Sequence, residues 1–441
     1  MNKKDNEIVI EVKDLHFSYT KSPFLRDINF SVTRGEIFGF LGPSGAGKST
    51  LQKVLTGLCT NYSGRACILG VDSNKHDKGF YEKIGVDFEF PSLFEKLTAK
   101  ENMREAIRGG NPDRFVNQYE GISLLMHPYM MTQPLLKKGD ENVVNGWGVT
   151  NSFPMNAPGA FPVHTPDKIV VKDIEQWQDY VHAPSLKFSD ELWNICKDMY
   201  AAVDGTKAYK AAFVAPGLFE QCHHLCSMQE ALMNYMEYPD EMHDLIKYLT
   251  DWELELAEGI CSNLHPDAIF HHDDWGSELN SFLRPSIFED FFLESYQKIY
   301  GYYHSHGVEL IFHHSDSYCA NILPIMIDMG IDVWQGCMHS NNVPECIEKY
   351  GDNIAFMGEI DNKQVDFEGW TQADCEKAAV HAMETCGMKH FIPCITQGGP
   401  GSLYQGTYKG LWDAIDDYNC KHFGFTKEQL EAQRLPMSIM F

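Results

Sequence analysis

The stretch Leu310-Ile311-Phe312-His313-His314-Ser315-Asp316 decides the fold of most of this chain. It is an apolar run that ends abruptly in polar, chemically capable side chains. Ala268-Ile269-Phe270 is followed in the same way by His271-His272-Asp273-Asp274. A buried strand that carries functional side chains at its C-terminal end has this pattern, which is typical of the parallel sheets of α/β proteins.

Short apolar runs alternate with helical patterns from residue 104 onward. The predicted strands include 211–214, 268–270, 308–312, 331–334 and 353–357, and the predicted helices cover 228–236, 239–258, 285–304 and 320–329. Repeated strand and helix units of this kind predict an α/β fold, the (β/α)₈ TIM barrel, whose active site lies at the C-terminal ends of the strands. Polar clusters at 271–274, 313–316, 335–336, 358–361 and 394–399 are therefore expected to gather at one mouth of the barrel.

This constellation resembles the uroporphyrinogen decarboxylase (URO-D) superfamily over residues 97–441, and within it the cobalamin-dependent methyltransferase branch. The most specific stretch runs from His313 to Gly336. In that branch, a His-x-Cys pair and a distant Cys bind Zn²⁺. Matching by position makes His314, Asp316 and Cys394 the expected metal ligands, with Asp in place of the first Cys. Zn²⁺ accepts nitrogen, sulfur and carboxylate oxygen, so this set is chemically reasonable.

The resemblance implies an enzyme that moves a methyl group between a small methylated substrate and a corrinoid protein. The corrinoid is expected on a partner, because the chain has no Asp-x-His-x-x-Gly segment to bind it. Asp274, His314 and Glu220 are the expected catalytic residues, with Glu220 as general acid or additional metal ligand. The structural alternative is that the histidines are satisfied by hydrogen bonds and that Cys394 fills a core.

A decarboxylase of the uroporphyrinogen type is the first alternative. Its substrate carries eight carboxylates, which arginine side chains grip through two donors each. Residues 104–441 contain five arginines, namely Arg104, Arg108, Arg114, Arg284 and Arg434. So few cations do not suit a polyacid, although a decarboxylase for a smaller acid stays open.

A complete phosphate-binding loop occupies the N-terminal part, where the pattern Gly-x-x-x-x-Gly-Lys-Ser runs over residues 42–49. Its glycines let backbone N–H groups close on phosphate oxygens, the lysine reaches the outer phosphates and the serine holds Mg²⁺. The expected nucleotide-binding residues here are Gly42, Gly45, Gly47, Lys48, Ser49 and Thr50. Strands are predicted at 7–12, 28–32 and 36–41, with a helix over 49–58.

Residues 1–103 resemble the N-terminal half of an ABC transporter ATP-binding domain. Tyr19 lies where that family stacks an aromatic ring on adenine, and Glu89 stands where a Gln is usual. The sequence has no Leu-Ser-Gly-Gly-Gln signature and no apolar strand that ends in Asp-Glu. ATP with Mg²⁺ is therefore an expected ligand, in an ATP-binding module, but hydrolysis is not expected.

Charge divides the chain at the same place. Residues 1–103 carry 14 Lys+Arg and 13 Asp+Glu, which leaves 22 and 49 for residues 104–441, so the net charge of −26 splits into +1 and −27. We therefore predict two domains, 1–103 and 104–441. The first is interpreted as vestigial or as the product of two coding sequences joined within residues 97–103, a stretch that fits both families.

The remaining composition predicts the surroundings of the protein. A strongly acidic second domain excludes nucleic acid as its partner. Thirteen irregularly spaced cysteines and the lack of an apolar leader indicate reduced thiols and a cytoplasmic location. No apolar run approaches the roughly 18 residues that span a bilayer, so direct membrane insertion is not expected.

Overall fold

The computed structural model describes residues 7–19, 24–43, 45–81, 83–85, 96–117, 119–157, 159–398 and 402–435. The chain divides into two compact units, Met1–Glu95 and Lys96–Phe441. The sequence-based boundary between residues 103 and 104 falls inside helix α3 (Ala99–Ile107). That helix belongs to the second unit, because the Lys100 ammonium donates to Asp267 Oδ2 at 3.1 Å and Leu97 N–H donates to Asp113.

The first unit is built on a four-stranded antiparallel sheet with the order β2-β1-β3-β4. Its elements are β1 (Ile8–Phe17), β2 (Leu25–Thr33), α1 (Lys48–Leu55), β3 (Tyr62–Ile68), β4 (Val71–Asp72) and α2 (Lys78–Tyr81). Buried side chains of β1, β2, β3 and α1 form its small core. The strands predicted at 7–12 and 28–32 and the helix after the phosphate loop are confirmed, although the helix ends three residues earlier.

The strand predicted at 36–41 was wrong, because residues 36–43 adopt neither strand nor helix. Ile37 and Leu41 are completely exposed. A central parallel strand is stable only between neighbours that cover both its edges and faces. The antiparallel strands of this unit provide no such neighbours, so the apolar segment lies in solvent.

The second unit is built on a parallel seven-stranded sheet of the TIM-barrel type, with the order β5-β9-β10-β11-β12-β13-β14. The strands are β5 (Ile122–Leu125), β9 (Tyr209–Val214), β10 (Ala268–His272), β11 (Leu310–His314), β12 (Val333–Cys337), β13 (Ala355–Ile360) and β14 (Phe391–Ile395). From β9 onward, sequential strands are neighbours. Helices separate them, as right-handed strand-helix-strand units require.

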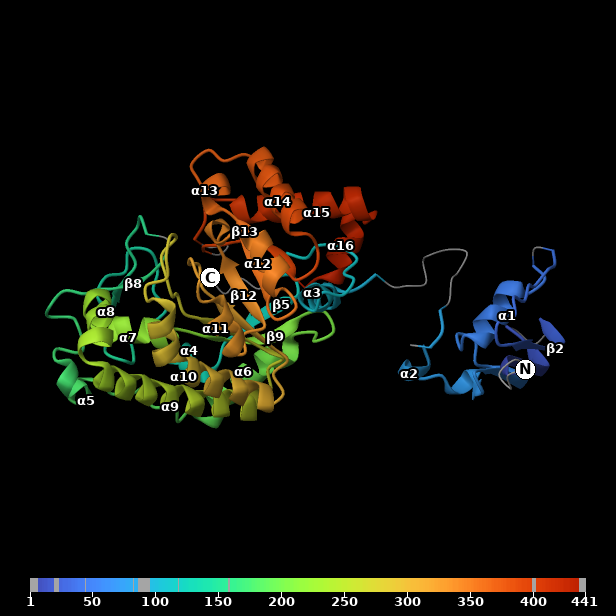
Figure 1. Ribbon diagram of the computed structural model, residues 1–441, viewed down its shortest axis with the longest axis horizontal. Helices are drawn as coiled ribbons and strands as arrows, with labels where there is room; N and C mark the ends of the chain where they lie inside the picture. Colours follow the sequence, from blue (N-terminus) through green and yellow to red (C-terminus); the bar gives the residue numbers. More distant parts are fainter. Residues whose placement is uncertain are drawn as a thin grey trace. The chain divides into compact units, whose positions relative to one another are not determined.

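Helices cover the outside of this sheet. The two longest, α9 (Pro239–Leu264) and α10 (Pro285–Ser305), run along one side of the unit in Figure 1. The others are α4 (Pro128–Thr132), α5 (Trp177–Tyr180), α6 (Asp190–Ala202), α7 (Leu218–Cys226), α8 (Met228–Glu237), α11 (Leu323–Asp328), α12 (Val343–Tyr350), α13 (Asn362–Val365), α14 (Gln372–Cys386), α15 (Thr407–Phe423) and α16 (Lys427–Gln433). A small sheet of β6 (Val143–Val144), β7 (Thr150–Ser152) and β8 (Phe161–Pro162) completes the unit.

Two cores fill the second unit. The larger lies between the sheet and the helices. The smaller lies inside the curled sheet, where Phe213, Phe270, Phe312, Met357 and Ile392 meet from five strands. In the part of the chain that the structure describes, no helix combines the length and apolar character needed to cross a membrane.

Candidate active site at the C-terminal ends of the strands

In each of the two His-His pairs, one imidazole lies on the inner face of the sheet and the other on the outer face. Strands β10 and β11 pair in parallel, with Phe270 beside Phe312, His271 beside His313 and His272 beside His314. Both phenylalanines lie in the inner core. Side chains two residues apart share a face, so His272 and His314 point toward the inside and His271 and His313 toward the helices.

The outward pair ties the sheet to its helices. His271 Nε2 lies 2.7 Å from the Glu253 Oε1 of α9, and His313 Nδ1 lies 2.8 Å from the Tyr300 hydroxyl of α10. All four side chains are buried. Burial holds the pKa of His313 well below its usual value, so this ring is neutral. These histidines are structural, as the hydrogen-bonded alternative anticipated.

The inward pair is arranged like a pair of metal ligands. His272 Nδ1 donates to Glu220 Oε2 at 2.9 Å, and His314 Nδ1 donates to the amide oxygen of Gln335. Both bonds use Nδ1, which leaves Nε2 of each ring for another partner. His314 Nε2 lies 3.9 Å from Asp274 Oδ1. Ligand atoms of His272, Asp274 and His314 all lie within 4.8 Å of one another.

The residue Asp273 fixes helix α7, which carries Glu220. Its carboxylate accepts the N–H groups of Phe219 at 3.0 Å and Glu220 at 2.7 Å, and it also accepts the Trp275 indole N–H at 2.8 Å. An acceptor at a helix N-terminus satisfies donors that the helix itself leaves open. The end of β10 therefore anchors the start of α7, which holds Glu220 beside His272.

The electrostatics of the cluster favour a cation. Burial raises the pKa of Glu220 to about 7, against the opposing effect of His272. Burial disfavours the charged form of His272, but Glu220 and Asp274 outweigh it and raise the pKa of that ring to about 10. Burial and the charge on Asp274 raise the pKa of Asp316 to about 8. Burial and then His272 lower the pKa of His314 to about 4.

The three residues expected as metal ligands are not brought together. Asp316 is adjacent to the cluster, since its N–H donates to Asp274 Oδ1 at 2.9 Å. Cys394 lies in the inner core, where its thiol donates to the Ile395 carbonyl and accepts from the Gln335 amide at 3.3 Å. Burial raises the pKa of this thiol. The Gln335 side chain thus stands between Cys394 and His314, and the ligand-type side chains that cluster with His314 are those of His272 and Asp274.

Two of the three residues expected to be catalytic, Asp274 and His314, lie within the cluster, and Glu220 lies beside it. Sequence reasoning missed His272 and Gln335. The signal was present, because alternation along β10 and β11 predicts which histidine of each pair shares a face with the buried phenylalanine. Gln335 follows from the same alternation, two residues after the inward Val333.

The described residues of the phosphate loop place Gly47 as the residue before α1, with a positive φ of 90°. A Cβ there would lie 2.6 Å from Leu25. Lys48 Nζ donates to the carbonyl oxygens of Gly42 at 2.8 Å and Pro43 at 2.9 Å. Tyr19 shares a hydrogen bond of 3.1 Å with Thr50. Gly45 also has a positive φ, and Ser49 is the second residue of the helix. Glu89 lies outside the described residues.

Four of the five arginines lie at the opposite end of the sheet from the cluster. Arg104 and Arg108 pair with Glu309, the residue before β11. Arg114 and Arg434 pair with Glu120, which precedes β5. All four guanidinium groups are therefore engaged near the N-terminal ends of strands and cannot grip a substrate at the mouth.

The cluster is open to solvent, which a substrate requires. The side chains of His272 and Asp274 are 31% and 28% exposed. A separate small pocket lies between the end of β9 and α9, and none of the three clustered residues lines it. The mouth with the two histidines is thus the better candidate for chemistry than this pocket.

Models of two protein families match different stretches of the chain. The model of the ABC transporter family matches residues 25–149, and the model of the uroporphyrinogen decarboxylase (URO-D) family matches residues 148–393. A methyltransferase from Methanosarcina mazei has a similar structure, with a TM-score of 0.52 and 14% identity, over 73% of this chain and 99% of that one. At this identity, the likeness shows the fold alone.

Curated relatives match a shorter stretch. A fluoroquinolones export ATP-binding protein of Mycobacterium tuberculosis is 49% identical over 98 residues, which are 22% of this chain and 33% of that protein. The probable multidrug ABC transporter ATP-binding protein YbhF of Escherichia coli is 41% identical over 98 residues, 22% of this chain and 17% of its own length. The chain thus spans a third or less of these two relatives.

Proposed function

Because the chain belongs to the uroporphyrinogen decarboxylase (URO-D) family, we propose that its second unit is a methyltransferase that moves a methyl group between a small methylated substrate and a corrinoid carried by a partner protein. The observation that carries this proposal is the His272, Asp274 and His314 cluster at the C-terminal mouth of the sheet. The likeness in fold to the Methanosarcina methyltransferase is consistent with it.

The donor set fits Zn²⁺. Two imidazoles and one carboxylate are a usual catalytic zinc set, with a position left for substrate. Each imidazole already donates its Nδ1–H to an oxygen, from Glu220 or Gln335, which is how zinc-binding histidines are held in protein sites. When bound, Zn²⁺ would act as a Lewis acid on the heteroatom that carries or receives the methyl group.

Residues of the chain orient the two imidazole rings and place apolar side chains beneath them. Glu220 and Gln335 fix the planes of the two rings, and Asp273 holds Glu220 through helix α7. Phe270 and Phe312 lie one layer below the histidines and close the inside of the sheet with apolar side chains. The mouth therefore offers polar donors above a floor from which water is excluded.

The decarboxylase alternative is weaker because of where the arginines lie. A polyacidic tetrapyrrole needs fixed cationic forks, and four of the five are engaged at the opposite end of the sheet. The side chains at the mouth are histidines and carboxylates instead. These suit a neutral or cationic methylated substrate.

Methylcobalamin is a direct probe of this function. The purified chain, loaded with Zn²⁺, is mixed with methylcobalamin and a small thiol, and transfer of the methyl group to sulfur yields cob(I)alamin and a thioether. The reverse direction is followed with cob(I)alamin and methylated phenols or amines. Enzyme-dependent change of the cobalamin spectrum in either direction supports the proposal. Release of CO₂ from a carboxylic acid without any corrinoid would favour the decarboxylase instead.

Gln335→Ala is expected to weaken Zn²⁺ binding by about 10- to 100-fold, the usual effect of losing a residue that orients a metal-bound histidine. The amide oxygen of Gln335 accepts the His314 Nδ1–H, so its loss frees the ring to rotate. Competition with a chromophoric chelator measures the affinity. Gln335→Glu keeps an oxygen acceptor and should restore most of it. Equal loss in both variants would contradict this role.

The first unit supports a second candidate function, nucleotide binding, because an ABC transporter segment with its phosphate loop is present. We propose that it binds ATP weakly and does not hydrolyse it. The apolar segment 36–41 lies exposed rather than in a sheet, so the loop lacks the rigid strand that normally precedes it.

Phosphate release from ATP is expected to stay at background for the full chain, and Lys48→Ala should leave the rate unchanged. The residues that would position Mg²⁺ and water for hydrolysis are not found in the sequence. A malachite green assay of the wild type and this variant makes the comparison. A rate that falls when Lys48 is removed would show that the loop is catalytically competent.

A further inference from the structure

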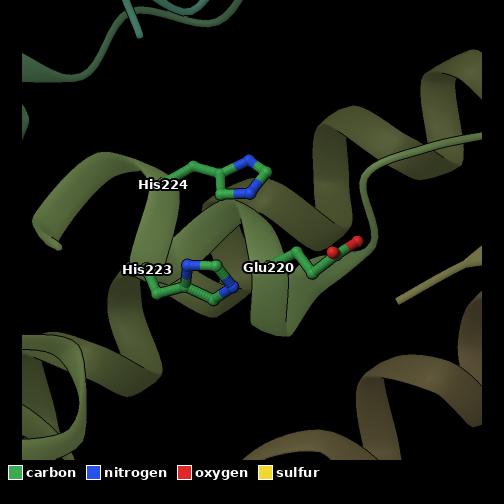
Figure 2. Close-up of side chains that lie close together, drawn as sticks. All are labelled: Glu220, His223 and His224. Carbon is green, nitrogen blue, oxygen red and sulfur yellow. The ribbon is translucent and has the colours of Figure 1, made fainter. Parts of the chain in front are cut away.

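A second cluster of ligand-type side chains lies on helix α7, next to the cluster of His272, Asp274 and His314. Glu220, His223 and His224 are spaced i, i+3 and i+4, which places them on one face of a helix. Their ligand atoms all lie within 4.8 Å of one another. Figure 2 shows the two imidazole rings together, with the Glu220 carboxylate to one side of them.

One imidazole nitrogen of this cluster lacks a hydrogen-bond partner among the described residues. His223 Nδ1 is buried without a hydrogen bond. A buried nitrogen lone pair without a partner costs free energy, which coordination to a cation would recover.

The charge around the cluster also calls for a cation. Glu220 stands near Asp273, whose carboxylate accepts the Glu220 N–H at 2.7 Å, and near Asp274, which lies in one cluster with its partner His272. Among the described residues, the ion-pair partners of Glu220 and Asp274 are histidines, with no Lys or Arg. Carboxylates that converge without lysine or arginine are a usual surrounding of a bound metal ion.

We propose that Glu220, His223 and His224 bind a second divalent transition-metal ion of the zinc class. Imidazole and carboxylate donors suit such an ion. Zn–N bonds are about 2.0–2.1 Å, so two ligand atoms on one ion lie at most about 4.2 Å apart and the side chains need only small rotations to close on it.

The second ion would act on the first site through Glu220. One oxygen of that carboxylate accepts the His272 Nδ1–H at 2.9 Å, so an ion on its other side would fix the carboxylate and, through it, the plane of His272. The N-terminus of helix α7 is already held by Asp273, the residue directly after the strand that carries His272. The inference concerns metal binding alone and does not depend on methyl transfer being the reaction.

Titration of the metal-free full chain with Zn²⁺ alone, in competition with a chromophoric chelator, tests the inference. The wild type is expected to bind two ions per chain. The double variant H223A/H224A should bind one, and His314→Ala should also bind one. His306→Ala, a matched change of an exposed histidine directly after α10, should still bind two.

The variants separate this site from the one proposed for catalysis. Loss of a single ion in H223A/H224A but not in His314→Ala would support this site and contradict the other. A wild type that binds one ion, lost only in His314→Ala, would overturn the inference. Co²⁺ absorption gives a second readout, since the milder His223→Asn should change the visible bands of one ion while circular dichroism shows an intact fold.

Discussion

Replacing His272 by alanine is expected to lower methyl transfer by about a thousandfold. The side chain supplies one of three ligand atoms that lie within 4.8 Å of one another, and its Nδ1 is already held by Glu220. A bound metal contributes several kcal/mol to stabilising the transition state, and roughly 4 kcal/mol corresponds to about three factors of ten in rate. Methylcobalamin turnover and the zinc content of the same preparation measure both effects.

The neighbouring histidine provides a matched control. His271→Ala removes an imidazole one residue away, but this ring faces outward to Glu253 on α9. We expect this variant to retain its zinc and most of its turnover while losing stability, because it leaves Glu253 buried without its partner. Equal loss of metal in both variants would mean that the two rings do not divide between the faces of the sheet.

Much of the second unit was predictable from the sequence, because its signals are local. Pro285 begins α10 and Pro239 begins α9, and the apolar runs before each polar cluster became β9 to β13. Proline at the first turn and buried apolar strands act through backbone geometry and solvent exclusion, which need no knowledge of distant contacts. The prediction that polar residues gather at the C-terminal mouth followed from the parallel order of the strands.

The ligand set was not predictable in the same way, because it depends on which side chains meet across strands. Cys394 and His314 both face the inside of the sheet, but Gln335 on β12, one of the two strands between them, lies between their side chains. A match by position in the sequence cannot show this interposed amide. The pairing of β10 with β11 can, since it places His272 beside His314 and brings Asp274 within reach.

The failure of the strand at 36–41 has a different physical origin. The local apolar run is a sound signal, but strand formation in a parallel sheet depends on neighbours far away in sequence. The first unit offers an antiparallel sheet that is complete without this segment. A local signal therefore gave the wrong structure because the context that the segment needs is not supplied by the described residues.

Arg114→Met is expected to lower the free energy of unfolding of the second unit by about 3–5 kcal/mol, the usual result of removing one partner of a buried ion pair. The Arg114 and Glu120 side chains are both fully buried, with Nη2 2.6 Å from Oε1. Arg114 also donates to the Phe115 carbonyl at 3.0 Å and to Gln433 at 3.1 Å. Urea unfolding followed by tryptophan fluorescence measures the change.

Two further variants test the cause. The double variant R114M/E120L removes both charges. It should regain at least half of the free energy of unfolding that R114M loses, since an apolar pair of similar volume can replace a buried ion pair. Arg108→Ala removes an exposed guanidinium that pairs with Glu309 at 2.8 Å and should cost less than about 1 kcal/mol. If the double variant were as unstable as R114M, the loss of stability would come from lost packing and hydrogen bonds around Arg114 rather than from an unpaired carboxylate. Arg434, which lies 3.3 Å from Glu120, would then be sufficient to balance the charge of Glu120.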